Sequence, residues 1–414
     1  MRFAFHPRLL LLAALLLFLA GPADRLLAHG EGAHQWTDSE EAILKGLWIG
    51  SLPDKPASPS NRFADDPAAA ALGRQFFFDK RFSGNSEVSC GTCHRPEYAF
   101  TDNLPRAHGM GFTERRTMPL AGAAWFNWLF WDGRKDSLWS QALGPIESSV
   151  EHGISRVFAV KVIMENYRED YEAIFGPLPT FVKLGRVLAR PDMTDPEAYK
   201  AWINIPHEDR DKVNMVYANF GKAVGAYVRT IVPGPARFDD YVQALLEGRA
   251  QDLPRIFSDD EAEGLRLFIG KAKCTNCHVG PLLTNSGFHN LGIAKKGEGG
   301  DRGRADGIIA VLADPFNCLG KYSDAQPRQC GELRFIDTGT EKYVGAFKTP
   351  TLRNVTERPP FMHAGQFKTI REVLEFYSRS RNPELGHGGL TGEEMEALEA
   401  FLGTLNGPIR ALGE

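Results

Sequence analysis

Apolar side chains recur at helical spacing in several parts of the chain. The longest such pattern covers residues 213–231, where an apolar residue returns every three or four positions until Pro233 ends it. Two earlier segments, 37–47 and 66–78, each open with a residue typical of a helix N-terminus. These patterns predict helices, and no comparable alternation predicts a sheet.

Three further helices are predicted by capping boxes, in which a Ser or Thr is followed three residues later by Glu. These pairs are Ser258 with Glu261, Thr369 with Glu372, and Thr391 with Glu394. By contrast, residues 95–150 are rich in Gly, Pro and aromatic side chains and have no clean period. A long irregular stretch is usually functional or disordered, and the tryptophans in this one favour function. The predicted fold class is mostly α.

The N-terminus has the pattern of an export signal. Residues 9–20 form an unbroken apolar run that is too short to cross a bilayer but suits the central region of a secretory signal peptide. Cleavage is plausible after Ala28 or Ala23, and we take residues 1–28 as the signal peptide. An uncleaved N-terminal anchor is the alternative. The predicted location is the periplasm, with no transmembrane segment in the mature chain.

Composition narrows the class of protein. The chain has 414 residues, of which 43% are hydrophobic and 24% charged, with a formal net charge of −4 and a pI near 6.3. This is ordinary globular composition, and the chain is long enough for two domains with their own cores. It has no basic footprint for nucleic acid.

The pattern Cys-x-x-Cys-His occurs twice, and it decides the predicted chemistry. Two such thiols can each add across a haem vinyl group, and the adjacent histidine then lies under the iron. A zinc ribbon would not need a histidine after each pair, and a thioredoxin-like pair would not repeat in this way. We therefore predict two covalent c-type haems, attached at Cys90, Cys93 and His94 and at Cys274, Cys277 and His278.

One haem motif in each half predicts two cytochrome c-like haem domains that meet near Pro233. Residues 29–234 form the predicted N-terminal haem domain, and residues 235–414 form the C-terminal one. The two remaining cysteines, Cys318 and Cys330, lie in a loop rich in Gly, Pro and Asp. In an oxidising compartment they are expected to form a disulfide that closes this loop.

From about residue 70 to 407 the sequence resembles the bacterial di-haem cytochrome c peroxidase family, and within it the MauG-like branch. The resemblance rests on GRQFFFD at 73–79, FWDGR at 130–134, GPIE at 144–147, TPTLRN at 349–354 and FMH at 361–363. It implies that the N-terminal haem reacts with H₂O₂ and that the C-terminal haem is a six-coordinate electron store. It also implies that Arg353 contacts a cofactor.

The sixth ligand of the second haem distinguishes the branches of the family. Family peroxidases have a methionine at the position of Tyr377, and MauG-like members have a tyrosine. Periodicity places Tyr377 on one helix face with Ile370, Val373 and Leu374. A buried tyrosine of the core would show the same pattern. The resemblance implies Tyr377 as the iron ligand, with Met362 as the competitor and Met110 and Met118 as remote candidates.

The resemblance also assigns a peroxide pocket, comprising Trp131, Gln141, Pro145 and Glu151. Cleavage of the O–O bond needs a group that takes a proton from one oxygen and delivers it to the other, and this role falls to Glu151. Gln141 would hold the peroxide or a water molecule, and Trp131 would lie between the haems and carry oxidising equivalents. By themselves, Glu151 could be a residue of a polar turn and Trp131 an ordinary core residue.

Other predicted metal sites rest on the resemblance alone. His108 lies in the loop that lends a ligand to the first haem in ordinary family peroxidases, whereas MauG-like members keep that haem open. His289 and His363 are expected to be structural. The family holds calcium with an asparagine side chain and two backbone carbonyls; the carbonyls match Arg358 and Pro360, and Thr117 or its neighbourhood replaces the asparagine.

Three functions compete. The first is a MauG-like peroxidase that uses H₂O₂ to form a high-valent di-haem state and oxidises side chains, for example tryptophan, of a partner protein. The second is a cytochrome c peroxidase that takes electrons from a small periplasmic donor, and the third is a di-haem electron carrier. Tyr377 favours the first. Some relatives have a surface tryptophan two residues before the second motif, where this chain has Ala272, so the exit route and the partner are expected to differ.

Overall fold

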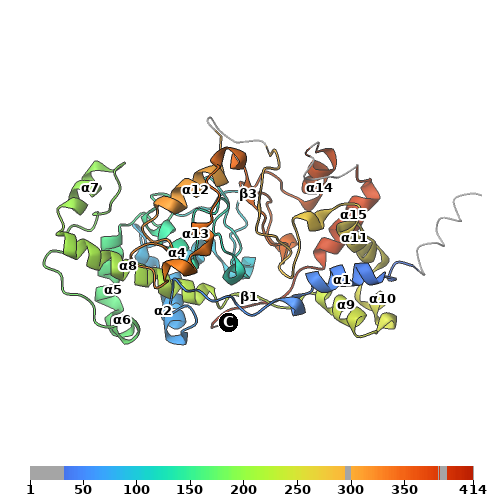
Figure 1. The fold of residues 1–414 in the computed structure, drawn as a ribbon, viewed down its shortest axis with the longest axis horizontal. Coiled ribbons are helices and arrows are strands. Elements are labelled where there is room, and N and C mark those ends of the chain that lie inside the picture. The colour runs from blue at the N-terminus through green and yellow to red at the C-terminus, as the bar shows by residue number, and fades with distance from the viewer. Residues whose placement is uncertain (1–31, 294–299, 381, 383–388, 414) are drawn as a thin grey trace, which may run out of the picture.

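The computed structural model describes residues 32–293, 300–380, 382 and 389–413. The predicted signal peptide, residues 1–28, lies outside the described residues. The described chain is mostly helical, as predicted, and Figure 1 shows an elongated molecule with helices gathered at both ends. None of the described helices is long and apolar enough to cross a membrane.

One group of helices surrounds a first hydrophobic core, which contains Phe76, Phe220 and Tyr227. These helices are α2 (Pro67–Phe78), α3 (Cys90–Cys93), α4 (Leu138–Glu147), α5 (Arg156–Asn166), α6 (Arg168–Phe175), α7 (Pro196–Ile203) and α8 (His207–Val228). The helix predicted over 213–231 is thus confirmed as the later part of α8. The helix predicted over 66–78 is confirmed as α2, which begins after the N-cap Asp66.

A second core contains Phe238, Phe268 and Phe401. The remaining helices are α1 (Asp38–Leu47), α9 (Arg237–Leu246), α10 (Leu253–Ile256), α11 (Asp259–Ile269), α12 (Arg304–Ala313), α13 (Gly331–Arg334), α14 (Ile370–Arg379) and α15 (Gly392–Gly403). The predicted capping boxes are confirmed at the starts of α11, α14 and α15.

The same kind of helix crossing builds both cores. Helix α2 leads toward the first haem motif and packs on α8, and helix α11 leads into the second motif and packs on α15. A Cβ atom on Gly73 of α2 would lie 1.9 Å from the carbonyl oxygen of Ala223, and one on Gly264 of α11 would lie 1.9 Å from that of Ala397. Each crossing therefore requires a glycine, because a side chain would separate the two backbones.

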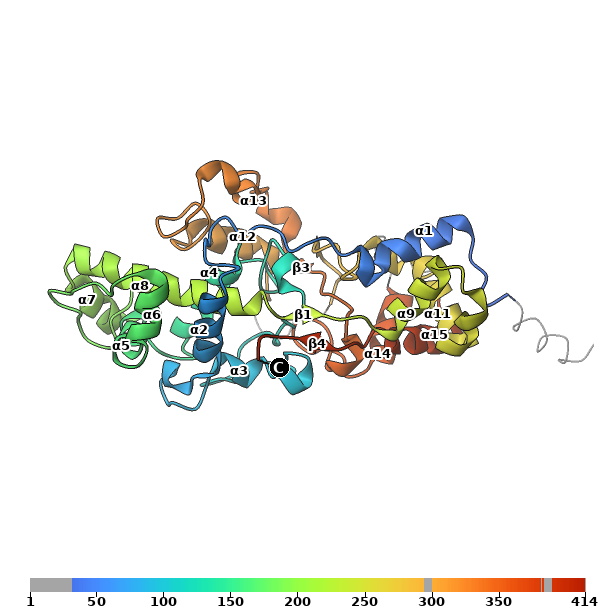
Figure 2. The same cartoon turned by 90° about the horizontal axis from the view of Figure 1, so that it is seen from below.

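Each of the two cores contains residues from both sides of the predicted domain boundary at 234. Helix α1 packs in the second core through Leu44 and Leu47, although it precedes the first haem motif. Conversely, Phe316, which follows α12, packs in the first core. Figures 1 and 2 show α1 beside α9 and α10 at one end of the molecule, and α12 and α13 over α4. The domain boundary at 234 stays a prediction.

Two short antiparallel pairs join distant segments near the middle of the molecule. Strand β1 (Val232–Pro233) pairs with β4 (Ile409–Arg410), and β2 (Phe288–His289) pairs with β3 (Phe347–Lys348). The second pair places the segment after the second haem motif beside the TPTLRN segment.

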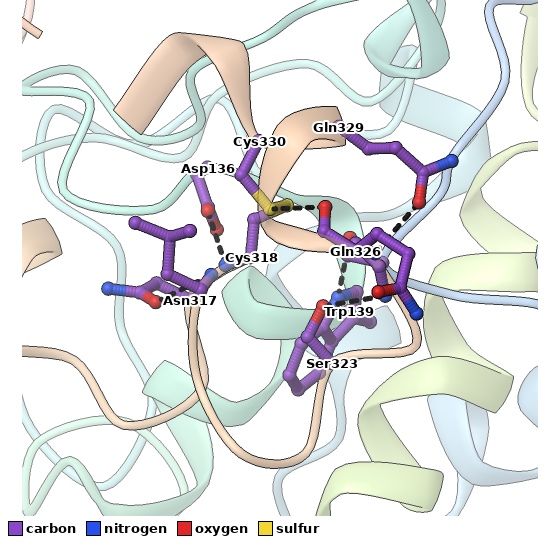
Figure 3. The surroundings of a disulfide bond; sticks show 11 residues. Asp136, Trp139, Asn317, Cys318, Ser323, Gln326, Gln329 and Cys330 are labelled. Carbon is purple, nitrogen blue, oxygen red and sulfur yellow. Dashed lines mark hydrogen bonds between the residues drawn. A yellow bond between two sulfur atoms is a disulfide. The ribbon is translucent and has the colours of Figure 1, made fainter. Parts of the chain in front are cut away.

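The predicted disulfide between Cys318 and Cys330 is confirmed, with 5.7 Å between the Cα atoms. Figure 3 shows that this loop is held against the first half of the chain, where the Cys318 amide donates to the Asp136 carboxylate at 2.7 Å. The loop therefore connects residues of the second half to the segment just before α4.

Candidate active site

Both Cys-x-x-Cys-His motifs present their histidines in the same way. The Nδ1 atom of His94 lies 3.1 Å from the carbonyl oxygen of Phe100, and that of His278 lies 3.0 Å from the carbonyl oxygen of Leu283. Because a carbonyl can only accept, Nδ1 carries the proton and Nε2 keeps its lone pair. Burial lowers the pKa of both histidines, that of His278 to about 4, so each imidazole is neutral. This is the form that binds iron.

A cavity of about 380 Å³ lies beside the first motif. It is lined by Cys93 and His94 and by all four residues of the predicted peroxide pocket, Trp131, Gln141, Pro145 and Glu151. Gln141 and Pro145 lie one turn apart on α4, which explains how they share a face. Glu151 follows in the turn after the helix. The structure therefore brings the predicted pocket together.

Glu151 has the electrostatic setting of a proton carrier. Burial raises its pKa, while a hydrogen bond from Ser148 and the charge of Arg134 act in the opposite direction. Its backbone is fixed as well, since its carbonyl accepts from the amide of Met110 at 2.9 Å. A carboxyl group with a raised pKa can hold or release a proton closer to neutral pH than a solvated one.

A second cavity, of about 180 Å³, lies beside the second motif. It is lined by Cys274, Cys277 and His278, by the predicted face of α14 (Ile370, Val373, Leu374 and Tyr377), and by Met362. Burial raises the pKa of the Tyr377 hydroxyl, and the nearby Cys274 and Cys277 raise it further. Both predicted sixth ligands, Tyr377 and Met362, thus reach the same cavity.

Trp131 lines both cavities, and its position is fixed at two points. Its indole Nε1 donates to the carbonyl oxygen of Arg116 at 3.0 Å, and its own carbonyl accepts from the amide of Lys348 at 2.8 Å. The predicted location between the two haem sites therefore agrees with the arrangement of the cavities.

Lys348 also lines both cavities, and no pattern in the sequence predicted this position. Its Nζ donates to the carbonyl oxygen of Trp128 at 2.8 Å and lies 4.3 Å from the centre of the Phe126 ring. Burial lowers its pKa to about 7. The only feature of the sequence that could have indicated its position is that it directly precedes the TPTLRN segment.

Several predicted residues lie elsewhere. His108 is exposed, stacks on Phe112 at 4.3 Å between ring centres, and is not among the residues that line the first cavity. Arg353 lines neither cavity. It is buried, where it pairs with Asp239 and donates through Nε to the carbonyl oxygen of Pro281 at 2.8 Å, so it braces the loop after the second motif.

The other candidates divide between the two cavities and the surface. Met118 lines the first cavity, and Met110 is 41% exposed. His289 and His363 line the second cavity. The His363 ring stacks on Phe347 at 3.7 Å between ring centres.

The residues of both cavities fit a c-type haem. The second cavity is lined by both cysteines of its motif, whereas the first is lined by Cys93, and Cys90 and Cys93 both line a smaller cavity beside His94. Each cavity also has a histidine Nε2 with an available lone pair and a largely apolar lining that suits a porphyrin. Glu151 lines the first cavity, whereas Tyr377 and Met362 line the second. The arrangement can support reaction at the first motif and storage of oxidising equivalents at the second.

Comparison with known proteins agrees with this chemistry. A family described as di-haem cytochrome c peroxidase matches residues 67–246. The methylamine utilization protein MauG of Methylorubrum extorquens is 30% identical over 370 residues, which cover 87% of this chain and 83% of that protein. The cytochrome c551 peroxidase of Pseudomonas aeruginosa is 27% identical over 404 residues, which cover 97% of this chain and 92% of that protein.

Solved structures show the same fold. The di-haem peroxidase BthA of Burkholderia thailandensis is 22% identical with a TM-score of 0.60, covering 85% of this chain and 89% of that one. A MauG-like protein associated with microbial copper homeostasis is 24% identical with a TM-score of 0.58, covering 87% of this chain and 96% of that one.

Proposed function

The chain belongs to the di-haem cytochrome c peroxidase family, and from this premise we propose that it is a MauG-like peroxidase that uses H₂O₂ to oxidise side chains of a partner protein. The family makes it an oxidoreductase with two haems. The proposal concerns its reductant, a protein side chain instead of a small electron donor. We place it in the periplasm, where the predicted signal peptide and the disulfide are both expected.

The observation that carries the proposal is Tyr377 in the second cavity, beside the second haem motif. A phenolate oxygen is a hard, anionic ligand that stabilises oxidised iron, whereas a thioether favours the reduced state. Tyrosine ligation therefore suits a haem that shares oxidising equivalents, not one that stores an electron for the peroxide site.

The residues of the first cavity have separate tasks. A haem held there by Cys90, Cys93 and His94 would supply redox-active iron for the two-electron reduction of H₂O₂. Glu151 takes the proton from one peroxide oxygen and delivers it to the other, which departs as water. Gln141 donates or accepts a hydrogen bond that holds the peroxide. The two electrons come from the partner's side chain, so two protons and H₂O₂ yield two water molecules.

Ala272 constrains how oxidising equivalents leave. This residue is 1% exposed and packs in the second core, so it presents no aromatic surface at that position. In relatives with a surface tryptophan at this position, oxidising equivalents can leave there. We therefore propose that the partner of this chain docks at another place on the second half.

A second candidate is a cytochrome c peroxidase fed by a small periplasmic cytochrome. Met362 favours it, because this thioether lies in the same cavity as Tyr377 and would suit a haem kept reduced. The family relatives include peroxidases of that kind.

Donor turnover separates the two candidates. The di-haem protein is mixed with H₂O₂ and a reduced small cytochrome c, and oxidation of the cytochrome is followed by absorbance. Glu151→Gln provides the background rate. Because the mixture contains no partner protein, the proposal predicts that the di-haem protein consumes no more than a stoichiometric amount of H₂O₂, with cytochrome oxidation close to that background. Rapid, saturable oxidation of the cytochrome would instead establish the second candidate.

A further inference from the structure

The calcium site implied by the family resemblance is not assembled in this chain. Calcium takes six to eight oxygen ligands, usually with several carboxylates. The hydroxyl of Thr117 donates to the carboxylate of Asp102 at 2.6 Å, and the carbonyl oxygen of Arg358 accepts from Nη1 of Arg116 at 2.9 Å. The residues present therefore do not fit calcium.

We propose that the guanidinium of Arg116 takes the place of calcium between the two halves of the molecule, so that this protein neither binds nor needs the ion. Nη1 of Arg116 binds one of the two carbonyl oxygens that would ligate calcium in the family. The positive charge of the Arg116 side chain thus binds this carbonyl oxygen in place of a calcium ion. The inference is independent of which reductant the enzyme uses.

The local charge also disfavours a second cation, although Asp102 and Glu357 supply nearby negative charge. Arg116 and Arg358 are both buried. Burial lowers the pKa of Arg116 to about 10, with the nearby charge of Asp102 acting against it. Burial, and then the charge of Arg116, lower the pKa of Arg358 to about 9. A divalent ion at this carbonyl would face two guanidinium groups, and their repulsion is strong where water is excluded.

Arg116 also connects this site to the centre of the enzyme. Its backbone amide donates to the carbonyl oxygen of His363 at 2.9 Å, so its side chain and its backbone both bind the 358–363 segment. Its own carbonyl accepts from the indole of Trp131 at 3.0 Å. Arg116 is thus a positioning residue, which holds Trp131 against the second half of the chain.

The test counts calcium and measures its effect on unfolding, two readouts that do not require peroxidase activity. The purified di-haem protein is dialysed against micromolar calcium and analysed by mass spectrometry for metals. Its thermal unfolding is then compared in EGTA, calcium chloride and magnesium chloride. The proposal predicts no stoichiometric calcium and one unfolding temperature in all three solutions, because a ligand of the folded state would raise it.

Variants separate the guanidinium from its surroundings. Arg116→Gln is expected to lower the ratio of folded to unfolded protein by about 5- to 150-fold, since it leaves a buried acceptor unsatisfied. Arg62→Gln is the control, because the Arg62 side chain is 69% exposed. One calcium per wild-type chain, a calcium-dependent unfolding temperature of the wild type, or full stability of Arg116→Gln would each overturn the proposal.

Discussion

Glu151 owes its proposed role to its position more than to its residue type. It follows the helix that carries Gln141 and Pro145, and all three line the cavity beside His94. Burial raises its pKa, so its protonated form persists to higher pH than that of a solvated glutamate. In this cavity the Glu151 carboxyl group can then move a proton between the two peroxide oxygens.

Substitution of this carboxyl group should slow the peroxide step alone. Glu151→Gln is expected to keep both haems attached and to slow the reaction with H₂O₂ by roughly 10²–10⁴-fold, the usual effect of losing a positioned proton carrier. Since the ionised form is the base, the wild-type rate should rise with pH through a pKa above 4.5. Stopped-flow absorbance measures both. Glu97→Gln, an exposed change in the same half, is the control. A wild-type rate in Glu151→Gln would reduce Glu151 to a structural residue.

Residues in local patterns were predictable, and residues defined by distant contacts were not. Thr37, Ser258 and Thr369 predict the starts of their helices, because a capping box involves only four consecutive residues. The buried position of Lys348 depends on the carbonyl oxygen of Trp128, which is 220 residues away in the sequence. Arg116 reaches Arg358 across 242 residues. Charged residues are normally exposed, so nothing local marks these two as buried.

At the scale of elements, the helix crossings place the haem motifs. Helices α2 and α8 approach until Gly73 meets the backbone of Ala223, and the first motif follows α2. The sequence predicted both helices, since their periodicity is strong, but it did not predict their crossing. It also did not predict that α1 and Phe316 would pack in the core of the opposite half, because such contacts have no local signal.

A side chain at this crossing should destabilise the first half. Gly73→Ala is expected to lower the free energy of unfolding by about 1–3 kcal/mol, because the new methyl group must displace the α8 backbone. Gly46→Ala is a matched control in helix α1, where an added Cβ has no atom within 4 Å. That change should raise stability by up to about 1 kcal/mol through helix propensity. Urea titration measures both values, and equal effects of the two substitutions would contradict the packing argument.

For the whole molecule, the central feature is the shared wall between the two cavities. Trp131 and Lys348 line both cavities. The Trp131 indole donates to a carbonyl oxygen in its own half, that of Arg116, and the Lys348 side chain donates to one in the other half, that of Trp128. The two halves are further interlocked by α1 and by the disulfide loop that packs near α4 (Figures 1 and 3). Under the proposed function, this shared wall would connect peroxide chemistry in the first cavity to the second cavity.

Loss of the indole at this wall should separate the two events. In Trp131→Phe the reaction with H₂O₂ at the first cavity is expected to continue, while the spectral change of the second haem is delayed. The reason is that proton transfer by Glu151 is local, whereas sharing of oxidising equivalents needs an oxidisable side chain between the cavities. Stopped-flow spectra resolve both phases. The control is Trp125→Phe, because the only hydrogen bond described for that indole goes to the carbonyl oxygen of Pro53. Simultaneous phases in Trp131→Phe would contradict the proposed role of the indole.

The ligation of the second haem tests the central claim most directly. Electron paramagnetic resonance of the oxidised di-haem protein is recorded for the wild type, Tyr377→Phe, Met362→Leu and the surface control Tyr199→Phe, whose residue is 36% exposed. If Tyr377 is the ligand, Tyr377→Phe alone changes the low-spin signal, because the phenyl ring has no donor atom for iron. An unchanged signal in Tyr377→Phe together with a changed one in Met362→Leu would make the second haem that of an ordinary cytochrome c peroxidase and contradict the MauG-like function.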